Sequence, residues 1–460
     1  MRSSGRCLRS KAEAIHLTMD SALKPPWINV QWQKRILDPV PELTFGPWCD
    51  KQPEELQTAK NRISVLEQTH RWELVKKMVN PYEMVYTHDD PHFHPSIAVI
   101  KPLSRSYFKL IEILDVLQFF EGLPKQAPKI RTAHIAEGPG GFIQAIADLA
   151  ERNKKTVQQA TAMTLRPTNQ RVPGWRRASS FLHHHREVRL HYGADNTGDV
   201  YVKENQDSFV ETVTCGANIF TADGGFDFSV NYDIQEKCVF KLLVCSAMTG
   251  LRCLQTDGSF VLKIFDIFSE STMVLIDLMG RCFKEWVLYK PAISRPCNSE
   301  RYFLGRGFTG VSLKALEEIE RRTVVEEYPS GVDSAYVRSH VLSQMEQQCK
   351  AILLAEKYAL QPEMWYETQL QNDFKTSLAW CQRFRIPFIW TKPMAVHPVV
   401  YTSEPVVFQR LLMPGDDLET LPPSYPALPT SSAEYLGQNQ DLLQSQKDGD
   451  NHERIREVES

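Results

Sequence analysis

The sequence of 460 residues lacks any run of about 18 consecutive apolar residues, the length that a transmembrane helix requires. We therefore expect no membrane-spanning segment. The N-terminus is rich in Arg and Ser but lacks the apolar core of a secretory signal. An unstructured N-terminus, or a true start at Met19, accounts for these residues better than a mitochondrial presequence, which is the less favoured alternative.

The ten cysteines are scattered, and none belongs to a Cys-x-x-Cys pair or to a His/Cys cluster at zinc spacing. No other metal-ligand constellation is visible, so we expect no metal cofactor. Scattered cysteines of this kind are typical of reduced residues in a protein core, which indicates an intracellular compartment.

The sequence has no excess of positive charge, because 53 Lys and Arg residues face 56 Asp and Glu residues, which gives a net charge of −3. This balance excludes a globally basic surface for nucleic acid, so any site for a polyanion must be a local patch. The stretch 166–189 has a single acid, Glu187, and these basic residues: Arg166, Arg171, Arg176, Arg177, His183, His184, His185, Arg186 and Arg189. It either contacts RNA phosphates or is a solvated loop, and Trp175 within it either stacks on a base or anchors the loop.

Residues 88–310 alternate short β-rich apolar runs with amphipathic helical patterns, which is typical of an α/β domain with a largely parallel sheet. The predicted strands are Thr132–Ala136, Ala160–Leu165, Val188–Tyr192, Ala217–Ala222, Ser259–Phe265, Glu285–Lys290 and Arg301–Gly305. The predicted helices are Ser104–Phe120, Gly141–Arg152, Ile234–Leu254 and Ser271–Phe283. The last two strands have no helix between them, which predicts a C-terminal hairpin.

Composition divides the chain into four predicted regions. Residues 1–87 form an N-terminal accessory region, which precedes the α/β domain at 88–310. Residues 311–413 form a C-terminal helical extension. Residues 414–460 are rich in Pro, Ser, Gln and charge with few aromatics, which is typical of a disordered tail.

A glycine-rich turn, Ala136-Glu-Gly-Pro-Gly-Gly-Phe142, follows the first predicted strand and opens a helix. Glycines at such a turn let the backbone approach a ligand, and the helix N-terminus offers free N–H donors. The spacing differs from G-x-G-x-x-G and no P-loop lysine follows, which argues against a dinucleotide or a nucleoside triphosphate. A small ligand with a carboxylate end, such as S-adenosylmethionine, fits the turn; a tight structural turn without a ligand is the alternative.

Four polar side chains stand beside apolar strands or helices. Lys263 lies inside an otherwise apolar strand, where its charge requires a nearby carboxylate or a function. Asp223 ends a strand at a Gly-Gly turn, at the carboxyl edge where open α/β sheets bind ligands. Each residue has an ordinary alternative when taken alone, since Asp223 caps a turn and Lys109 is a solvated helix residue. Glu300, likewise, forms a salt bridge with Arg306 in that reading.

Six motifs accompany these residues: PGGF at 139–142, GDV at 198–200, ADGGFDFS at 222–229, QE at 235–236, LKIFD at 262–266 and SRPCNSERY at 294–302. With them, about residues 80–310 resemble the FtsJ-like ribose 2′-O-methyltransferases, and within that family the mRNA cap-specific branch. The NPYEMVYTH run at 80–88 and the ADGGFDFS motif look most like cap methyltransferases of kinetoplastids and large DNA viruses. The resemblance implies a Rossmann-like S-adenosylmethionine-dependent methyltransferase core with a mostly parallel seven-stranded sheet, flanked by helical and irregular extensions.

The resemblance also implies roles for individual residues. A catalytic Lys-Asp-Lys-Glu tetrad falls on Lys109, Asp223, Lys263 and Glu300. The binding site for the cofactor S-adenosyl-L-methionine corresponds to Glu137, Gly138, Pro139, Gly140, Gly141, Phe142, Asp199, Val200 and Asp223. The resemblance assigns RNA contacts to Ser104, Ile234, Gln235 and Asn298. The basic stretch adds Arg176 and Arg177 as further RNA contacts. Capped mRNA or another RNA is the implied partner, together with other capping or transcription machinery and no membrane, in the nucleus or, for a viral protein, the cytoplasm.

The second predicted strand departs from a pattern common among such methyltransferases, in which an acidic residue after this strand holds the ribose hydroxyls. Here the strand ends Ala162-Met-Thr-Leu-Arg166, without a carboxylate. Asp195 either substitutes for that acid or is a loop turn residue. Asn196 stands where relatives often have Gly, and because Asn tolerates a positive φ we expect the turn to be kept.

Three functions fit this sequence: a cap 2′-O-methyltransferase, an FtsJ-like methyltransferase of rRNA or another internal RNA site, and a catalytically inactive RNA-binding scaffold. The intact tetrad weighs against the scaffold, and the long extensions at both ends weigh against the second function. The protonation state of Lys263 is open at this stage. A neutral amine acts as a base, whereas an ammonium stabilises a developing alkoxide.

Overall fold

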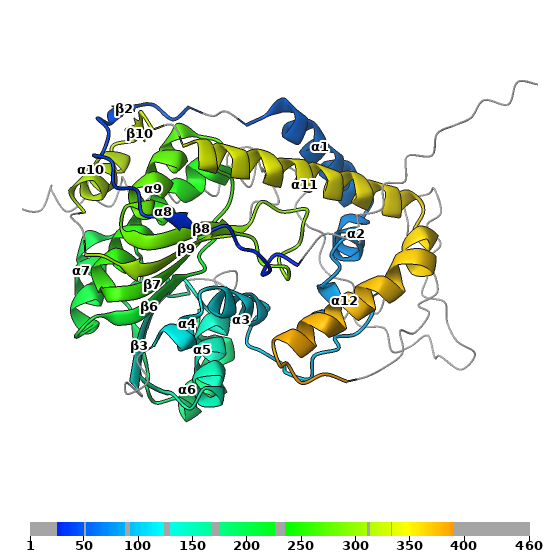
Figure 1. Ribbon diagram of the computed structural model, residues 1–460, viewed down its shortest axis with the longest axis horizontal. Helices are drawn as coiled ribbons and strands as arrows, with labels where there is room; N and C mark the ends of the chain where they lie inside the picture. Colours follow the sequence, from blue (N-terminus) through cyan, green and yellow to red (C-terminus); the bar gives the residue numbers. More distant parts are fainter. Residues whose placement is uncertain are drawn as a thin grey trace, which may run out of the picture. The chain divides into compact units, whose positions relative to one another are not determined.

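The computed structural model describes residues 25–49, 52–87, 93–123, 129–167, 174–225, 235–310, 313–332 and 334–389 (Figure 1). The predicted tail at 414–460 and the predicted RNA-contacting residue Ile234 lie outside the described residues. Among the described residues, no helix combines the length and the apolar character needed to cross a membrane.

A central sheet organises the chain. Its strands follow the order β1 (Gln33–Lys34), β8 (Phe283–Tyr289), β9 (Arg301–Phe308), β7 (Leu254–Ile264), β6 (Ala217–Ala222), β3 (Lys129–Ile135), β4 (Thr156–Met163) and β5 (Val188–His191). All seven predicted strands are present, and the parallel α/β class is confirmed. The sheet gains an eighth strand that the sequence did not predict, β1, whose two residues are too few to show an alternating pattern.

Strand directions also match the prediction. The pairs β7–β6, β6–β3, β3–β4 and β4–β5 are parallel, whereas β9 runs antiparallel to both β7 and β8. The predicted hairpin is therefore formed by β8 and β9. The added strand β1 pairs antiparallel with β8 at the edge.

Four helices were predicted close to their observed bounds: α3 (Ser106–Val116) and the crossover helices α5 (Gly141–Arg152), α8 (Gln235–Cys253) and α9 (Glu270–Gly280). The crossover through α5 moves along the sheet in the opposite direction to those through α8 and α9. Because parallel crossovers are right-handed, α5 and its neighbour α3 lie on one face, and α8 and α9 lie on the other (Figure 1). The predicted helix Ser104–Phe120 is interrupted at Gln118, whose φ of 51° is left-handed, and α4 (Phe119–Gly122) follows.

Two helices of the sheet domain, α6 (Ser179–His184) and α7 (Lys203–Thr212), were not predicted from the sequence. Helix α7 has a weak apolar stripe, because two of its three buried residues, Asn205 and Gln206, are polar. Helix α6 buries no residue fully. Hydrophobic periodicity therefore had little to detect in either segment.

Elements from before and after the sheet pack on one another. Helices α1 (Glu54–Gln68) and α2 (Trp72–Met78) lie against α11 (Ala335–Leu360), and η1 (Glu83–Val85) lies against α12 (Leu370–Arg383) (Figure 1). Strand β2 (Thr44–Gly46) pairs with β10 (Tyr328–Ser330), the strand that follows α10 (Lys314–Thr323) in the sequence. The domain boundaries at 87/88 and 310/311 stay predictions, but the two flanking regions contact each other.

The order in which the chain lays down its strands reverses between β3 and β6. From β3 the chain continues through β4 and β5 to one side, whereas β6 and β7 lie on the other. Ligands of open α/β sheets bind at the carboxyl ends of the strands where the order reverses in this way. The glycine turn follows β3 and Asp223 follows β6, so both predicted ligand segments lie at this edge.

Candidate active site

The four predicted tetrad residues come together from four separate elements. Lys109 lies on α3, Asp223 follows β6, Lys263 is the penultimate residue of β7, and Glu300 immediately precedes β9. Lys109 Nζ lies 2.7 Å from Glu300 Oε1, and Lys263 Nζ lies 3.7 Å from Glu300 Oε2. Lys263 Nζ also lies 3.4 Å from Asp223 Oδ1. Antiparallel pairing of β7 with β9 sets Lys263 opposite Tyr302 and so beside Glu300, and parallel pairing of β6 with β7 brings Asp223 next to Lys263.

Glu300 is the carboxylate that both lysines share. Its side chain is 7% exposed, and the Ser294 hydroxyl donates a hydrogen bond of 2.7 Å to its Oε1. Burial by itself would raise the pKa of Glu300, but Lys109 and Lys263 hold it well below its usual value. The ordinary alternatives are wrong for both partners, because Lys109 is largely buried and Arg306 pairs with Glu285 instead.

Lys263 stays an ammonium in this environment. Burial favours its neutral amine, but the carboxylates of Asp223 and Glu300 outweigh burial and raise the pKa of Lys263. Its Nζ also donates to the Asp223 carbonyl oxygen at 3.3 Å. Of the two protonation states that the sequence left open, the charged one is favoured. Asp223 is more than a turn cap, since its Oδ1 also accepts a hydrogen bond of 2.8 Å from the Tyr302 hydroxyl.

Lys290 is a further cation at this site that the sequence analysis did not single out. Its Nζ donates to Asn298 Oδ1 at 2.7 Å, to the Asn298 carbonyl at 2.8 Å and to the Glu300 carbonyl at 2.9 Å. Burial lowers the pKa of Lys290 to about 7, against the opposing charge of Glu300. Its only sequence signal is its position directly before the loop that carries SRPCNSERY.

The glycine turn between β3 and α5 is closely packed by its neighbours. Gly140 has a φ of 106°, a left-handed conformation that side chains rarely adopt. A Cβ on Gly141 would lie 2.2 Å from Ser104 Oγ, so this residue must be Gly for the segment before α3 to approach. Ser104 Oγ and Ser106 Oγ are 2.5 Å apart. Ser104, a predicted RNA contact, thus lies against the turn, and the predicted Phe142 is fully buried behind it.

Glu137 begins this turn as a buried carboxylate. The Thr221 hydroxyl donates to its Oε1, and His134 Nδ1 lies 3.1 Å from its Oε2. Oε2 accepts no hydrogen bond from a described residue. Burial raises the pKa of Glu137, although His134 and Thr221 oppose the shift. A cationic ligand at this edge would favour its charged form.

The loop after β5 brings Asp199 to the same edge. A Cβ on Gly198 would lie 2.1 Å from the carbonyl oxygen of Thr164, so the loop crosses directly over the end of β4. Asp199 Oδ1 accepts a hydrogen bond of 2.8 Å from Tyr201 N, and Val200 is buried between them. Asn196 has a φ of 66°, which confirms the predicted turn.

Asp195 serves the loop itself. Its Oδ1 accepts hydrogen bonds from the backbone and the hydroxyl of Thr197, and its side chain is exposed. These bonds agree with the turn-residue interpretation. Arg166 stacks over the Tyr192 ring at 4.1 Å and donates to Asn196 Oδ1 at 2.7 Å, so it too helps to hold this loop.

The remaining predicted RNA residues differ in exposure. Arg176 and Arg177, in η2 (Arg176–Ala178), and Asn298 are exposed, whereas Gln235 at the start of α8 is buried. Trp175 is only 7% exposed and packs in a core cluster with Ile143, Ala160, Ala162 and Ala178. Of its two predicted roles, base stacking is wrong and the buried anchor is confirmed.

The residues at this edge suit a small cationic ligand with a carboxylate end. Two acids, Glu137 and Asp223, lie after adjacent strands, and the N-terminus of α5 offers N–H donors beside them. Among the described residues, no three His, Cys, Asp or Glu side chains gather as they would around a metal ion.

Comparisons with known proteins bear on this geometry. Residues 102–308 match the FtsJ-like methyltransferase family. The cap-specific mRNA (nucleoside-2′-O-)-methyltransferase 1 of Xenopus laevis is 30% identical over 314 residues, which cover 63% of this chain and 33% of that protein. The Trypanosoma brucei brucei protein of the same name is 31% identical over 228 residues, which cover 47% of this chain and 59% of that protein. The matched part of the chain thus spans about a third of the length of the Xenopus protein and about three fifths of the length of the trypanosome protein.

Replacing the shared carboxylate tests its structural role. Glu300→Gln leaves two buried ammonium groups without their common partner, so we expect a loss of about 3–5 kcal/mol in the free energy of unfolding at pH 7. The folded-state pKa of Glu300 lies below its unfolded value of about 4.3. Its stabilisation is therefore present above that pH and is lost as the pH falls through the folded-state pKa.

Urea unfolding at stepwise lower pH measures this difference, which should narrow on acidification because protonated Glu300 resembles Gln. Glu285→Gln is the matched control, since Glu285 also pairs with two cations, Lys34 and Arg306, but is more exposed. It should cost at most about 1 kcal/mol. A Glu300→Gln effect as small as the control, or independent of pH, would contradict the assigned interaction.

Proposed function

We propose that this chain is an FtsJ-like, S-adenosyl-L-methionine-dependent RNA methyltransferase that modifies mRNA caps, because residues 102–308 match the FtsJ-like methyltransferase family. The acceptor is the ribose 2′-hydroxyl of a cap-proximal nucleotide. One observation carries the proposal: Lys109, Asp223, Lys263 and Glu300 form a single buried charge cluster beside the glycine turn.

The proposed reaction needs alignment and charge stabilisation more than bond activation. A ribose hydroxyl is a weak acid and a weak nucleophile. S-adenosyl-L-methionine, when bound, supplies an electrophilic methyl group on a sulfonium sulfur. The 2′-oxygen would take the methyl group as the C–S bond of the bound cofactor breaks, and the hydroxyl proton would be lost. Ideal positioning in such a displacement is worth up to about 7–11 kcal/mol.

The residues of this chain divide that work in the following way. Lys263, held as an ammonium by Asp223 and Glu300, stabilises the negative charge that develops on the 2′-oxygen. As an ammonium it cannot accept the hydroxyl proton, which passes to water. Lys109, fixed by Glu300, orients the hydroxyl or the adjacent phosphate.

The cofactor site rests on the edge formed by β3, β6 and the loop after β5. Gly138–Phe142 and the α5 N-terminus hold the methionine carboxylate, which matches the N–H donors and positive dipole end there. Glu137 and Asp223 face the cationic part of the cofactor. Asp199 and Val200 hold the nucleoside part, because their loop crosses the end of β4.

The RNA follows the basic stretch toward the four-residue cluster. The exposed Arg176 and Arg177 contact phosphates, and Ser104 and Asn298, with Ile234–Gln235, contact the cap-proximal nucleotides. The names of the relatives favour capped mRNA over rRNA or another internal site. Capped mRNA, other capping or transcription machinery as partners, and the nucleus as compartment belong to this proposal.

Lys263 carries the sharpest test. Lys263→Ala should reduce methyl transfer to the 2′-hydroxyl of a short capped RNA by about 10²–10³-fold, since it removes the charge beside the developing oxyanion. Lys263→Arg should also be nearly inactive, because the guanidinium is larger and planar. Transfer to capped and uncapped versions of one RNA, with the modified nucleotide mapped, is the measurement.

The exposed lysine variant Lys284→Ala is the control and should keep parental activity. A folded Lys263→Ala protein with near-parental turnover would overturn the role of Lys263. Equal transfer to the uncapped RNA would refute cap dependence while leaving the methyltransferase assignment intact.

Asp199 and Asp195 lie on one loop, and replacing each in turn distinguishes a role in cofactor binding from a role in the structure of the loop. Asp199→Asn should weaken S-adenosylhomocysteine binding at least tenfold, because an amide replaces the acceptor carboxylate at the nucleoside. Asp195→Asn should leave the affinity within twofold, since the Asp195 carboxylate accepts hydrogen bonds from Thr197 of its own loop. Titration calorimetry measures both, and the reverse ranking would reassign the acidic role to Asp195.

The basic stretch makes a prediction about salt dependence. Replacing Arg176 and Arg177 together by Ala should weaken RNA binding and flatten the slope of log K against log salt by up to about 1.4, from about 0.7 per lost phosphate contact. The control replaces two exposed cations of α10 and α11, Arg321 and Lys350, by Ala. Fluorescence anisotropy over a salt series gives both slopes. Identical slopes in parent and Arg176/Arg177 variant would place the RNA elsewhere.

A further inference from the structure

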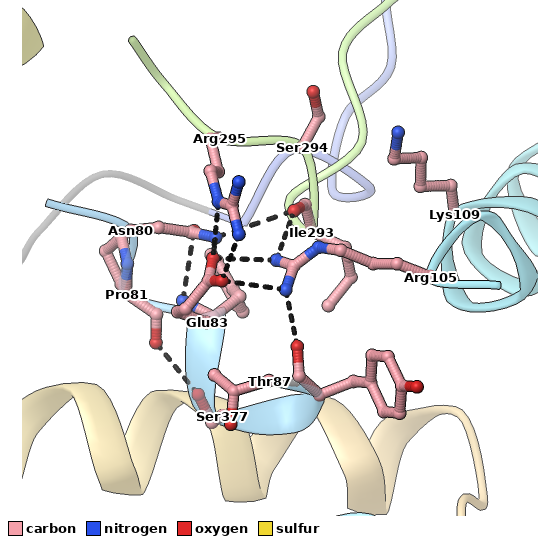
Figure 2. A network of polar contacts seen from close by, with 12 residues as sticks. Asn80, Pro81, Glu83, Thr87, Arg105, Lys109, Ile293, Ser294, Arg295 and Ser377 are labelled. Atoms are coloured by element: carbon pink, nitrogen blue, oxygen red, sulfur yellow. Dashed lines mark hydrogen bonds and ion pairs between the residues drawn. The ribbon is translucent and has the colours of Figure 1, made fainter. Parts of the chain in front are cut away.

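A second buried charge cluster lies next to the proposed active site, and Glu83 of η1 is its centre (Figure 2). Glu83 has no exposed surface, yet it meets two guanidinium groups from distant segments. Arg105 donates to both of its oxygens, at 3.0 and 2.9 Å, and Arg295 does so at 2.7 and 3.2 Å. Asn80 Nδ2 adds a hydrogen bond of 2.8 Å to Oε2. We call these four residues the Glu83 cluster.

The carboxylate of Glu83 is charged. Burial favours its neutral form, but Arg105 and Arg295 outweigh burial and lower its pKa. Without that negative charge, the two guanidinium groups would face each other with no carboxylate between them. The cluster therefore holds Arg105 and Arg295 together only while Glu83 keeps its charge.

The two arginines belong to the segments that carry Lys109 and Glu300. Arg105 is the N-cap residue of α3, and Lys109 stands four residues later, one turn along the same side of the helix (Figure 2). Arg105 also donates to the carbonyl oxygen of Ile293 at 2.9 Å. The adjacent Ser294 donates to Glu300 Oε1. Glu83 is thus linked to Lys109 through Arg105 and helix α3, and to Glu300 through Arg105, the carbonyl of Ile293 and the adjacent Ser294.

Glu83 is also attached to the C-terminal helical region. Pro81, two residues before it, accepts a hydrogen bond of 3.0 Å from Ser377 of α12 (Figure 2). Element η1 packs against α12. The segment that supplies Glu83 is therefore held between the sheet domain and α12.

We infer that Glu83 is a positioning residue for methyl transfer, which sets the distance between the Lys109 helix and the Glu300 loop through Arg105 and Arg295. The inference rests on the proposed function, because it assigns Lys109 and Glu300 to the reaction. A purely stabilising role is the rival, and it predicts a loss of stability with unchanged turnover of the folded protein.

Glu83→Gln is the decisive variant, because it keeps the size of the side chain and removes its charge. Arg105 and Arg295 then repel each other, and the Lys109–Glu300 contact lengthens. We expect turnover on capped RNA at saturating substrates to fall at least tenfold, while the affinity for S-adenosylhomocysteine stays within twofold. Glu83→Asp keeps the charge and should recover a large part of the lost turnover.

The control is Asp277→Asn, which removes a buried carboxylate that binds an arginine, Arg281, at 2.7 Å on α9. It should lower the melting temperature of the full chain without changing turnover at 25 °C. If Glu83→Gln behaves in the same way as this control, the rival is correct and the positioning role is refuted.

A second measurement does not depend on activity. Brief acylation of surface amines, followed by peptide mass spectrometry, reports how well Glu300 protects Lys109. Labelling of Lys109 should rise several-fold in Glu83→Gln and stay unchanged in Asp277→Asn. If the parent methylates no RNA but this rise occurs, the proposed function fails and the positioning of Lys109 stands. If the parent is active and neither turnover nor labelling changes in Glu83→Gln, the inference alone is overturned.

Discussion

The structure depends on the burial of one carboxylate, Glu300, between two lysines. A buried ammonium is costly without a partner, and Lys109 and Lys263 reach the same carboxyl group from α3 and β7. The loop before β9 must therefore return to the carboxyl edge of the sheet, which it does through the β8–β9 hairpin. The Ser294 hydroxyl and the Lys290 amine hold that loop in place through hydrogen bonds to the carboxylate and the carbonyl of Glu300.

Buried ionisable side chains recur where the flanking regions meet the sheet domain. Lys60 of α1 pairs with Asp266, just after β7, at 3.1 Å with both side chains almost fully buried. Glu112 of α3 accepts hydrogen bonds from Tyr289, from the backbone of Ala292 and from Trp380 of α12. Truncating one partner of such an interaction strands the other, so each contact ties a flanking element to the site tightly. The flanking helices thus act as a scaffold for the loops that carry the charge cluster.

Residues within strong local patterns were predicted correctly. The seven strands, the helices α3, α5, α8 and α9 and the hairpin follow from hydrophobic periodicity, because each buries a regular face. Strand β1 and helices α6 and α7 were not predicted, since two residues or a mostly polar stripe produce no period. Trp175 had two interpretations, and only packing against Ile143 and the β4 alanines decided between them.

The sequence by itself determined the fold class, the glycine turn and the four residue types of the charge cluster, because these are encoded in local order and in motifs. It could not determine which carboxylate each lysine meets, since those partners lie up to 191 residues apart. Nor could it determine that Lys263 stays charged, because burial and two acids act on its pKa in opposite directions. The Glu83 cluster was invisible for the same reason. Its carboxylate gains a role only when folding brings Arg105 and Arg295 to it from segments 22 and 212 residues away.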